Sequence, residues 1–274
     1  MKAIINRKAT LAVLGILAVV ALTACGQPDE VRSEPNKPDV PNGRSQHALV
    51  APIMVCVLVD FSASIAHYGV KIPTVSDLTP LIDSIDRFGG ELAVGTIQED
   101  PSTPLLRLRL PPRERGLQPP SQSVDVFTRR KLVREFEKAQ PEFEERERLR
   151  RAGNRALIED FVQHLDEYLK RGATAQATDL WGNVRRCDTF LQEDVLYWMA
   201  QGGQEPARHL LIVSDGRHNV DSSSFWDIDK GVTVTAVSGA RGLGSLSEIK
   251  RLRWFESARA AVSFIVTQIE RNKK

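Results

Sequence analysis

Apolar runs separated by polar stretches predict the strands of a sheet. One run, Ile53–Val59, has seven consecutive apolar residues, and a strand without a polar face must be covered on both sides. It therefore belongs in the middle of the sheet. In Leu106–Leu110 leucines alternate with arginines, which predicts an edge strand with one solvated face. The remaining strands are expected at Glu91–Ile97, Leu210–Val213, Val232–Val237 and Ala261–Val266.

Between these runs, apolar residues recur at helical spacing. We expect one helix to begin at Thr79 and Pro80, a hydroxyl cap followed by proline, and to end at Gly89. Further helices are expected after Asp179 and over Ser247–Ser257. Because strands and helices alternate almost throughout, the pattern predicts a doubly wound, mainly parallel α/β sheet of about six strands.

A long helix-forming stretch, residues 124–170, interrupts this alternation, with Pro141 and Gly153 as its expected breaks. Asn154–Lys170 has a dense apolar stripe and is expected to lie on the sheet. Residues 125–152 have only a thin stripe, so we expect an added arm within a helical insertion at about 111–153. Its balanced charges favour a solvated extension over a partner-binding helix. They also argue against nucleic-acid binding.

The first residues have the layout of an export signal. A basic start precedes the apolar run Leu11–Leu22, which is shorter than the about 18 to 20 residues that a membrane-spanning helix needs. The following Leu22-Thr23-Ala24-Cys25 resembles the bacterial lipobox, in which the cysteine is lipidated and becomes the new first residue. The resemblance implies a signal peptide at 1–24 and an acylated Cys25. An ordinary secretory peptide is the alternative.

The segment 25–47 is rich in proline and charge and has almost no large apolar side chain. Such a segment cannot bury enough surface to fold, so we expect a tether between the lipid and a domain at 48–274. A diacylglycerol plus an amide-linked chain is enough for lasting membrane attachment. The expected location is the cell envelope, on the periplasmic or extracellular face of the inner or the outer membrane.

Three side chains with hydroxyl or carboxylate oxygens follow the most apolar run. Asp60 ends the strand, and Ser62 and Ser64 come directly after it. Ligands of α/β folds bind where parallel strands open at their carboxyl ends. Oxygens of this kind suit a small hard cation, Mg²⁺ first and Mn²⁺ or Ca²⁺ next.

This Asp-x-Ser-x-Ser pattern resembles the metal-ion-dependent adhesion site of von Willebrand factor A domains. In that family a threonine from a later loop and an aspartate after a second central strand complete the site, and Thr178 and Asp215 stand at the matching places. The resemblance implies that Ser62, Ser64 and Thr178 bind the cation directly and that Asp60 and Asp215 bind it directly or through water. It also implies a short antiparallel edge strand. Since Mg²⁺ takes six oxygens, one position is left for an acidic side chain of a protein partner.

Other interpretations of the same residues remain open. The serines could satisfy turn backbone, Thr178 could cap a helix, and Asp215-Gly216 could be an ordinary strand exit. An enzyme is the main rival, a magnesium-dependent hydrolase or phosphotransferase using Asp60. Such enzymes place a second acid two residues on, where this chain has Ser62, so we expect no enzyme. A third interpretation is a metal-free scaffold that binds through the arm.

Charge and cysteine usage narrow the picture further. The formal net charge is only +2, which gives no electrostatic case for a nucleic-acid partner. Besides Cys25 the chain has two cysteines, Cys56 on the central strand and Cys187 on a sheet-facing stripe. A disulfide in an oxidising compartment and two buried thiols are both compatible with this placement. His218, near Asp215, is expected in an exposed loop.

Overall fold

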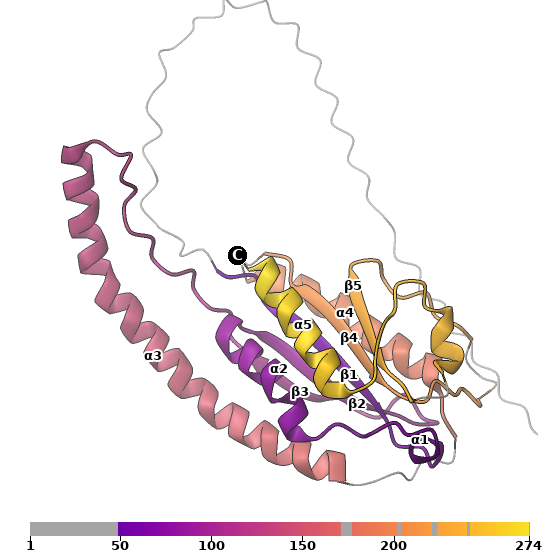
Figure 1. Cartoon of the computed structure of the whole chain (residues 1–274). Coiled ribbons are helices and arrows are strands. Elements are labelled where there is room, and N and C mark those ends of the chain that lie inside the picture. Colours follow the sequence, from indigo (N-terminus) through magenta and orange to yellow (C-terminus); the bar gives the residue numbers. More distant parts are fainter. Residues whose placement is uncertain (1–48, 171–176, 202–203, 221–223, 240–241, 274) are drawn as a thin grey trace, which may run out of the picture. The chain divides into compact units, whose positions relative to one another are not determined.

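The computed structural model describes residues 49–273, apart from 171–176, 202–203, 221–223 and 240–241 (Figure 1). These described residues belong to a compact unit at Gln46–Lys274. The predicted signal peptide at 1–24, the lipidation site Cys25 and the tether that ends at 47 lie outside the described residues. Within them, no helix has the length and apolar character needed to cross a membrane.

A six-stranded sheet forms the centre of the unit, in the order β3-β2-β1-β4-β5-β6. All neighbouring strands are parallel except β2 and β3, which pair antiparallel. The predicted fold class is therefore confirmed, including its short antiparallel edge strand. The strands are β1 (Ile53–Asp60), β2 (Gly90–Ile97), β3 (Leu106–Leu110), β4 (Ala207–Val213), β5 (Val232–Val237) and β6 (Arg253–Phe255).

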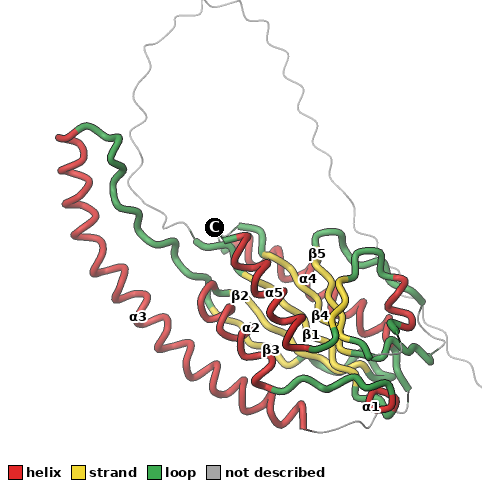
Figure 2. Tube along the Cα trace, viewed as in Figure 1, coloured by secondary structure: helices red, strands yellow, loops and turns green. Residues whose placement is uncertain are grey.

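Strand β1 is buried along its whole length, with alternate side chains in two separate cores. Val55 and Val57 belong to the core under α2 (Val75–Phe88), α5 (Ala258–Asn272) and the second half of α3 (Val126–Lys170). Met54 and Leu58 belong to the core under α4 (Leu180–Ala200). Figure 2 shows the strands between these helices. The absence of a polar face on β1 thus explains its central place.

Two expected elements are wrong. Ala261–Val266 is not a strand but part of α5, whose buried residues Ala261, Ile265 and Ile269 recur at helical spacing. The expected helix at Ser247–Ser257 is instead a 3₁₀ turn, Gly244–Glu248, followed by β6. The sheet has six strands, as expected, but its last strand is a different segment.

The first long helix, α2, begins at Val75, earlier than the expected Thr79-Pro80 start. Thr74 caps it, because its hydroxyl accepts from the backbone N–H of Asp77 at 3.3 Å while the Asp77 carboxylate accepts from the Thr74 N–H at 3.0 Å. This reciprocal capping box satisfies two helix-end donors. It outweighs the proline signal, and Pro80 lies inside the helix.

Helix α3 runs without interruption from Val126 to Lys170, through both expected breaks at Pro141 and Gly153. The arm and the sheet-covering helix are therefore one element. No residue of α3 before Phe143 is buried, so the first seventeen residues of the helix, 126–142, make an exposed arm. We call residues 126–142 the α3 arm.

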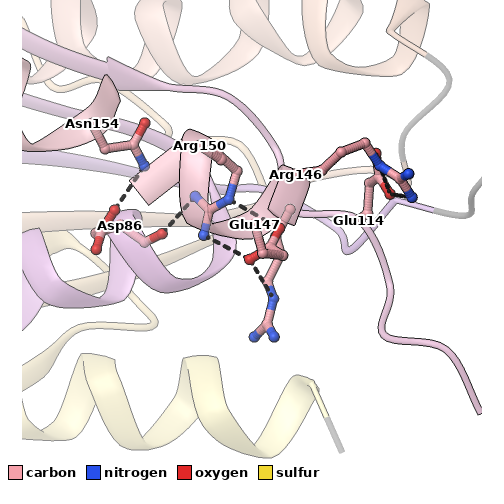
Figure 3. A network of polar contacts seen from close by, with 7 residues as sticks. Asp86, Glu114, Arg146, Glu147, Arg150 and Asn154 are labelled. Atoms are coloured by element: carbon pink, nitrogen blue, oxygen red, sulfur yellow. Dashed lines mark hydrogen bonds and ion pairs between the residues drawn. The ribbon is translucent and has the colours of Figure 1, made fainter. Parts of the chain in front are cut away.

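A polar network holds the middle of α3 to the rest of the unit (Figure 3). The Asn154 amide donates to the Asp86 carboxylate at 2.7 Å, and the Arg150 guanidinium donates to the Asp86 carbonyl oxygen at 2.9 Å. Glu147 accepts from Arg150 at 3.1 Å, and Arg146 donates to Glu114 at 3.0 Å. The Glu147–Arg150 contact lies within α3, whereas Asp86 belongs to α2 and Glu114 to the loop after β3. The contacts from these two elements fix α3 close to the expected break at Gly153.

A disulfide joins the central strand β1 to helix α4, which covers one face of the sheet. Cys56 on β1 and Cys187 on α4 are both fully buried, with their Cα atoms 6.0 Å apart. The open choice between a disulfide and free thiols is thereby decided for the disulfide. The bond links residues 131 positions apart, so it constrains a large part of the unfolded chain.

We expect reduction of this disulfide to lower the free energy of unfolding by about 3 to 5 kcal/mol, because the unfolded chain regains the freedom of a long loop. Urea unfolding with and without dithiothreitol measures the effect. A Cys56→Ala/Cys187→Ala variant is the control, and its stability should not respond to dithiothreitol. An equal response in the variant, or none in the natural protein, contradicts the expectation.

One buried histidine lies in the sheet with no hydrogen-bond partner in the described part of the chain. His209 on β4 is 2% exposed, and both of its ring nitrogens lack a partner there. Its neighbours across the sheet are Val55 and Thr233. Burial, with a smaller contribution from the charge of Lys273, lowers the pKa of His209 from 6.5 to about 4. The ring is therefore neutral in the folded protein at neutral pH.

Stability should fall as the pH drops from about 6.5 to about 4. In this window the unfolded chain binds a proton at His209 that the folded protein does not bind. The difference is on the order of 3 kcal/mol, measurable as the urea midpoint at each pH. His209→Leu should remove this part of the slope, whereas His67→Leu at an exposed histidine should leave it. An unchanged slope in His209→Leu would exclude the histidine as its origin.

Candidate metal site at the carboxyl edge of the sheet

Two neighbouring strands bring the predicted aspartates to one edge of the sheet. Strands β1 and β4 are parallel, with Val59 opposite Val213. The residues that follow this pair, Asp60 on one strand and Ser214 and Asp215 on the other, therefore leave the sheet side by side. The edge is the one at which α/β folds bind their ligands.

Asp60 is fully buried, and each of its carboxylate oxygens accepts a hydrogen bond. Oδ1 accepts from the backbone N–H of Ser62 at 2.7 Å, and Oδ2 accepts from the hydroxyl of Ser214 at 2.8 Å. The Ser214 hydroxyl in turn accepts from the N–H of Gly216 at 3.0 Å. Ser214 is thus a structural member of the site that the sequence pattern did not single out.

Ser62 and Ser64 follow at the turn into the short helix α1 (Ser64–His67). Their hydroxyl oxygens are 3.0 Å apart and hydrogen-bonded to each other. Ser62 is buried and Ser64 is half-buried. The two hydroxyls therefore lie together in the turn that directly follows Asp60.

Thr178 is 2% exposed and is placed by its backbone. Its N–H donates to the side-chain oxygen of Asn219 at 2.5 Å, and its carbonyl oxygen accepts from the Asn219 N–H at 3.2 Å. The N–H of the next residue, Asp179, donates to the carbonyl oxygen of Gln98 at 3.2 Å. Gln98 follows β2 and Asn219 lies in the loop after β4, and these strands flank β1 on either side. Thr178 is thus held between the loops that flank the end of β1.

Asp215 is 4% exposed, and one of its carboxylate oxygens has no partner among the described residues. Oδ1 accepts from the N–H of Arg217 at 3.0 Å, whereas Oδ2 is buried and receives no hydrogen bond from any described residue. Gly216 has a φ of 74°, and a side chain there would strike the carbonyl oxygen of Leu243. Only glycine suits this tight turn.

The two carboxylates oppose each other electrostatically. Burial raises the pKa of Asp60, the hydrogen bonds from Ser62 and Ser214 act against this rise, and the negative charge of Asp215 adds to it. A buried carboxylate oxygen without a donor is costly unless a cation compensates it. The residues at this edge therefore fit a divalent cation. They would hold it through two carboxylates and three hydroxyls, all hard oxygen donors.

The composition of the site distinguishes it from an acid- or histidine-rich metal centre. Among the residues that the structure describes, no three of His, Cys, Asp or Glu are grouped so as to hold a metal ion. Only two of the five predicted ligands are of these types. His218 lies instead beside the cap of α4, with its Nδ1 atom 4.0 Å from Asp179 Oδ1. Asp179 accepts there from the N–H of Gly182 at 2.8 Å.

No protein-family model and no curated protein matches the sequence. Among solved structures, the chain is similar to proximal thread matrix protein 1 from the mussel byssus, at 12% identity and a TM-score of 0.32 over 81% of this chain and 48% of that one. A second structure of that protein, with a zinc-occupied MIDAS motif, matches at 12% identity and a TM-score of 0.31 over 81% and 48%. The manganese-loaded TRAP protein of Plasmodium vivax matches at 14% identity and a TM-score of 0.34 over 80% and 73%.

The chain spans about half the length of the mussel protein. These similarities are too distant to bear on what this chain binds. The case for a metal site rests on the residues at the carboxyl edge themselves.

We expect Ser214→Ala to lower the free energy of unfolding by about 1 to 3 kcal/mol, because it leaves Asp60 Oδ2 buried without its donor. Urea unfolding without added metal measures the loss. Ser263→Ala, at an exposed position on α5, is the matched control and should change stability by less than about 0.5 kcal/mol. Equal effects of the two substitutions would show that the Ser214 hydroxyl does not support the carboxylate.

Proposed function

We propose that this protein is a protein-binding module, for adhesion or assembly, that depends on a divalent cation. Asp60, Ser62, Ser64, Thr178 and Asp215 hold the cation, with Mg²⁺ as the first choice. The bound cation accepts a carboxylate from a partner protein at its remaining coordination position. The observation that carries the proposal is the buried Asp215 Oδ2, which lacks a donor among the described residues, next to the Asp60 carboxylate.

The chain's own residues support binding more than catalysis. The position two residues after Asp60 holds a serine rather than the second acid that an aspartate-based phosphotransferase needs. We therefore propose a non-enzymatic role.

The proposed location is the surface of a bacterial membrane, reached by a lipid on Cys25 after removal of 1–24. The buried disulfide between Cys56 and Cys187 supports an oxidising compartment, because disulfides persist mainly outside the cytosol. An envelope location also suits a module that meets its partner outside the cell or in the periplasm.

We expect Mg²⁺ to stabilise the natural protein and Asp60→Asn to abolish this effect. The predicted stabilisation is about 2.7 kcal/mol at a free Mg²⁺ concentration of about 100 times the dissociation constant. Titration calorimetry and thermal unfolding both measure it. Ser64→Ala removes one half-buried hydroxyl and should weaken binding without unfolding the protein. Asp83→Asn, at an exposed residue of α2, is the control and should bind Mg²⁺ normally.

Two results would contradict the proposal. Equal Mg²⁺ uptake by Asp60→Asn and the natural protein would place the ion elsewhere, and Mg²⁺-dependent turnover of a phosphoester would favour the enzyme. The partner is tested separately, by capture from envelope extracts with Mg²⁺ or with a chelator. Capture must require both Mg²⁺ and Asp60.

A further inference from the structure

One face of the α3 arm is exposed to solvent. Arg130 and Lys131 each lie three or four residues from Phe127 and from Arg134, and Lys138 follows Arg134 by four. These five residues therefore lie on one side of the helix. All five are exposed, and Phe127 is 82% exposed. We call these five residues the basic face of the arm.

The basic residues of the arm lie near the N-terminus of α3, where positive charge is unfavourable. A helix N-terminus favours negative groups, yet no acidic residue lies in the first turn of α3, and basic residues follow directly. The cap Asp125 accepts from the N–H groups of Phe127 and Thr128 at 3.0 and 3.1 Å and is the acidic group at this end. An external anionic surface would offset the excess positive charge.

The arm also has little else to stabilise it. A helix of about this length is marginal in water without tertiary packing, and residues 126–142 contribute no buried side chain. Val133 and Phe136 are half-buried, whereas the basic face is open to solvent. A contact made by the basic face would therefore supply packing that the folded unit lacks.

The contacts of α3 show which way the arm points. Tyr168, near the end of α3, stacks edge-on against Phe61, which follows β1 at the carboxyl edge. Further back along α3, Arg146 pairs with Glu114, and Glu114 forms a bridge with Leu49, where the described chain begins. Since Ile53 starts β1 just after Leu49, α3 runs in the same direction as β1, from the edge of the sheet at which β1 begins (the starting edge) to the carboxyl edge.

Residues 126–142 must then continue past the starting edge of the sheet by about 25 Å. Figure 1 shows the first half of α3 extending beyond the end of the sheet where β1 begins. The arm and the first described residues are thus at the same end of the sheet, the starting edge. The candidate metal site is at the opposite edge.

We propose that the basic face of the α3 arm docks on an anionic lipid surface. Phe127 and Val126, which are 82% and 63% exposed, would enter the interfacial region, and the lysines and arginines of the basic face would contact lipid phosphates. If Cys25 is lipidated as proposed, the chain reaches the domain at the same end of the sheet as the arm, so the lipid and the arm can engage one membrane. The inference goes beyond cation binding, and the test below depends neither on the lipid nor on the metal.

A second copy of the chain fits the face less well. The acidic residues further along α3 of that copy would be the natural complement of the basic face. Two of them are already paired, Glu147 with Arg150 and Glu145 with Arg148. Lipid headgroups above an apolar interior match both kinds of side chain on the basic face.

The test uses the unlipidated chain from residue 26 onward, which includes the whole compact unit. It is sedimented with vesicles of phosphatidylcholine alone and with vesicles containing phosphatidylglycerol, at low and high salt. We expect binding only to the anionic vesicles and its loss at high salt, since screening shortens the range of the attraction. Arg130→Glu/Lys131→Glu/Arg134→Glu should weaken binding by at least about 100-fold. Phe127→Ala should weaken it about tenfold.

A variant with the same change in charge elsewhere provides the control. Arg151→Glu/Arg155→Glu/Lys250→Glu changes exposed residues outside the arm and should retain most of the binding. Circular dichroism and the thermal midpoint establish that each variant is folded. The proposal is overturned if the chain binds neither kind of vesicle, if it binds both equally, or if the two charge variants lose binding equally. Sedimentation equilibrium showing a dimer that the arm variant lacks, without vesicle binding, would assign the basic face to a second copy.

Discussion

The burial of β1 on both faces is the constraint from which the rest of the structure follows. A strand of eight buried residues must have strands on both sides and helices above and below. Its last residue, Asp60, is then enclosed by the loops after β2 and β4, away from water. An enclosed carboxylate needs donors, and Ser62 and Ser214 supply them. The chemistry of the carboxyl edge is thus a consequence of packing at the centre of the sheet.

This dependence explains how much of the site could be predicted from the sequence. Asp60 and Asp215 each end an apolar run, so parallel pairing of the two strands was enough to bring them together. Ser214 and Asn219 carry no such signal, because their roles depend on partners in other segments: Asp60 for one and Thr178 for the other. Short polar residues in loops have many possible partners, and only the folded chain selects among them.

Some elements of the fold are likewise set by local sequence and others by contacts with distant segments. The expected strand at Ala261–Val266 is part of α5 because six apolar residues alone do not distinguish a strand from a buried helix; the Ser257 cap and the spacing of Ala261, Ile265 and Ile269 do. Helix α3 is the opposite case. Its local breakers predict two helices, but Asp86, Glu114 and Arg113 bind the helix from outside and keep it continuous. Tertiary contacts here override propensity.

The two proposals concern opposite edges of one compact unit, and this arrangement has a consequence for binding. A domain attached to a membrane at one point alone can rotate, so a site on it faces a partner only part of the time. A second contact through the arm would restrict that rotation and hold the carboxyl edge away from the membrane. The Cys56–Cys187 bond ties β1 to α4, and Asp179 caps α4 directly after Thr178. The segments that carry the proposed ligands Asp60 and Thr178 are therefore held by the fold itself, which would reduce the entropy lost on binding a partner.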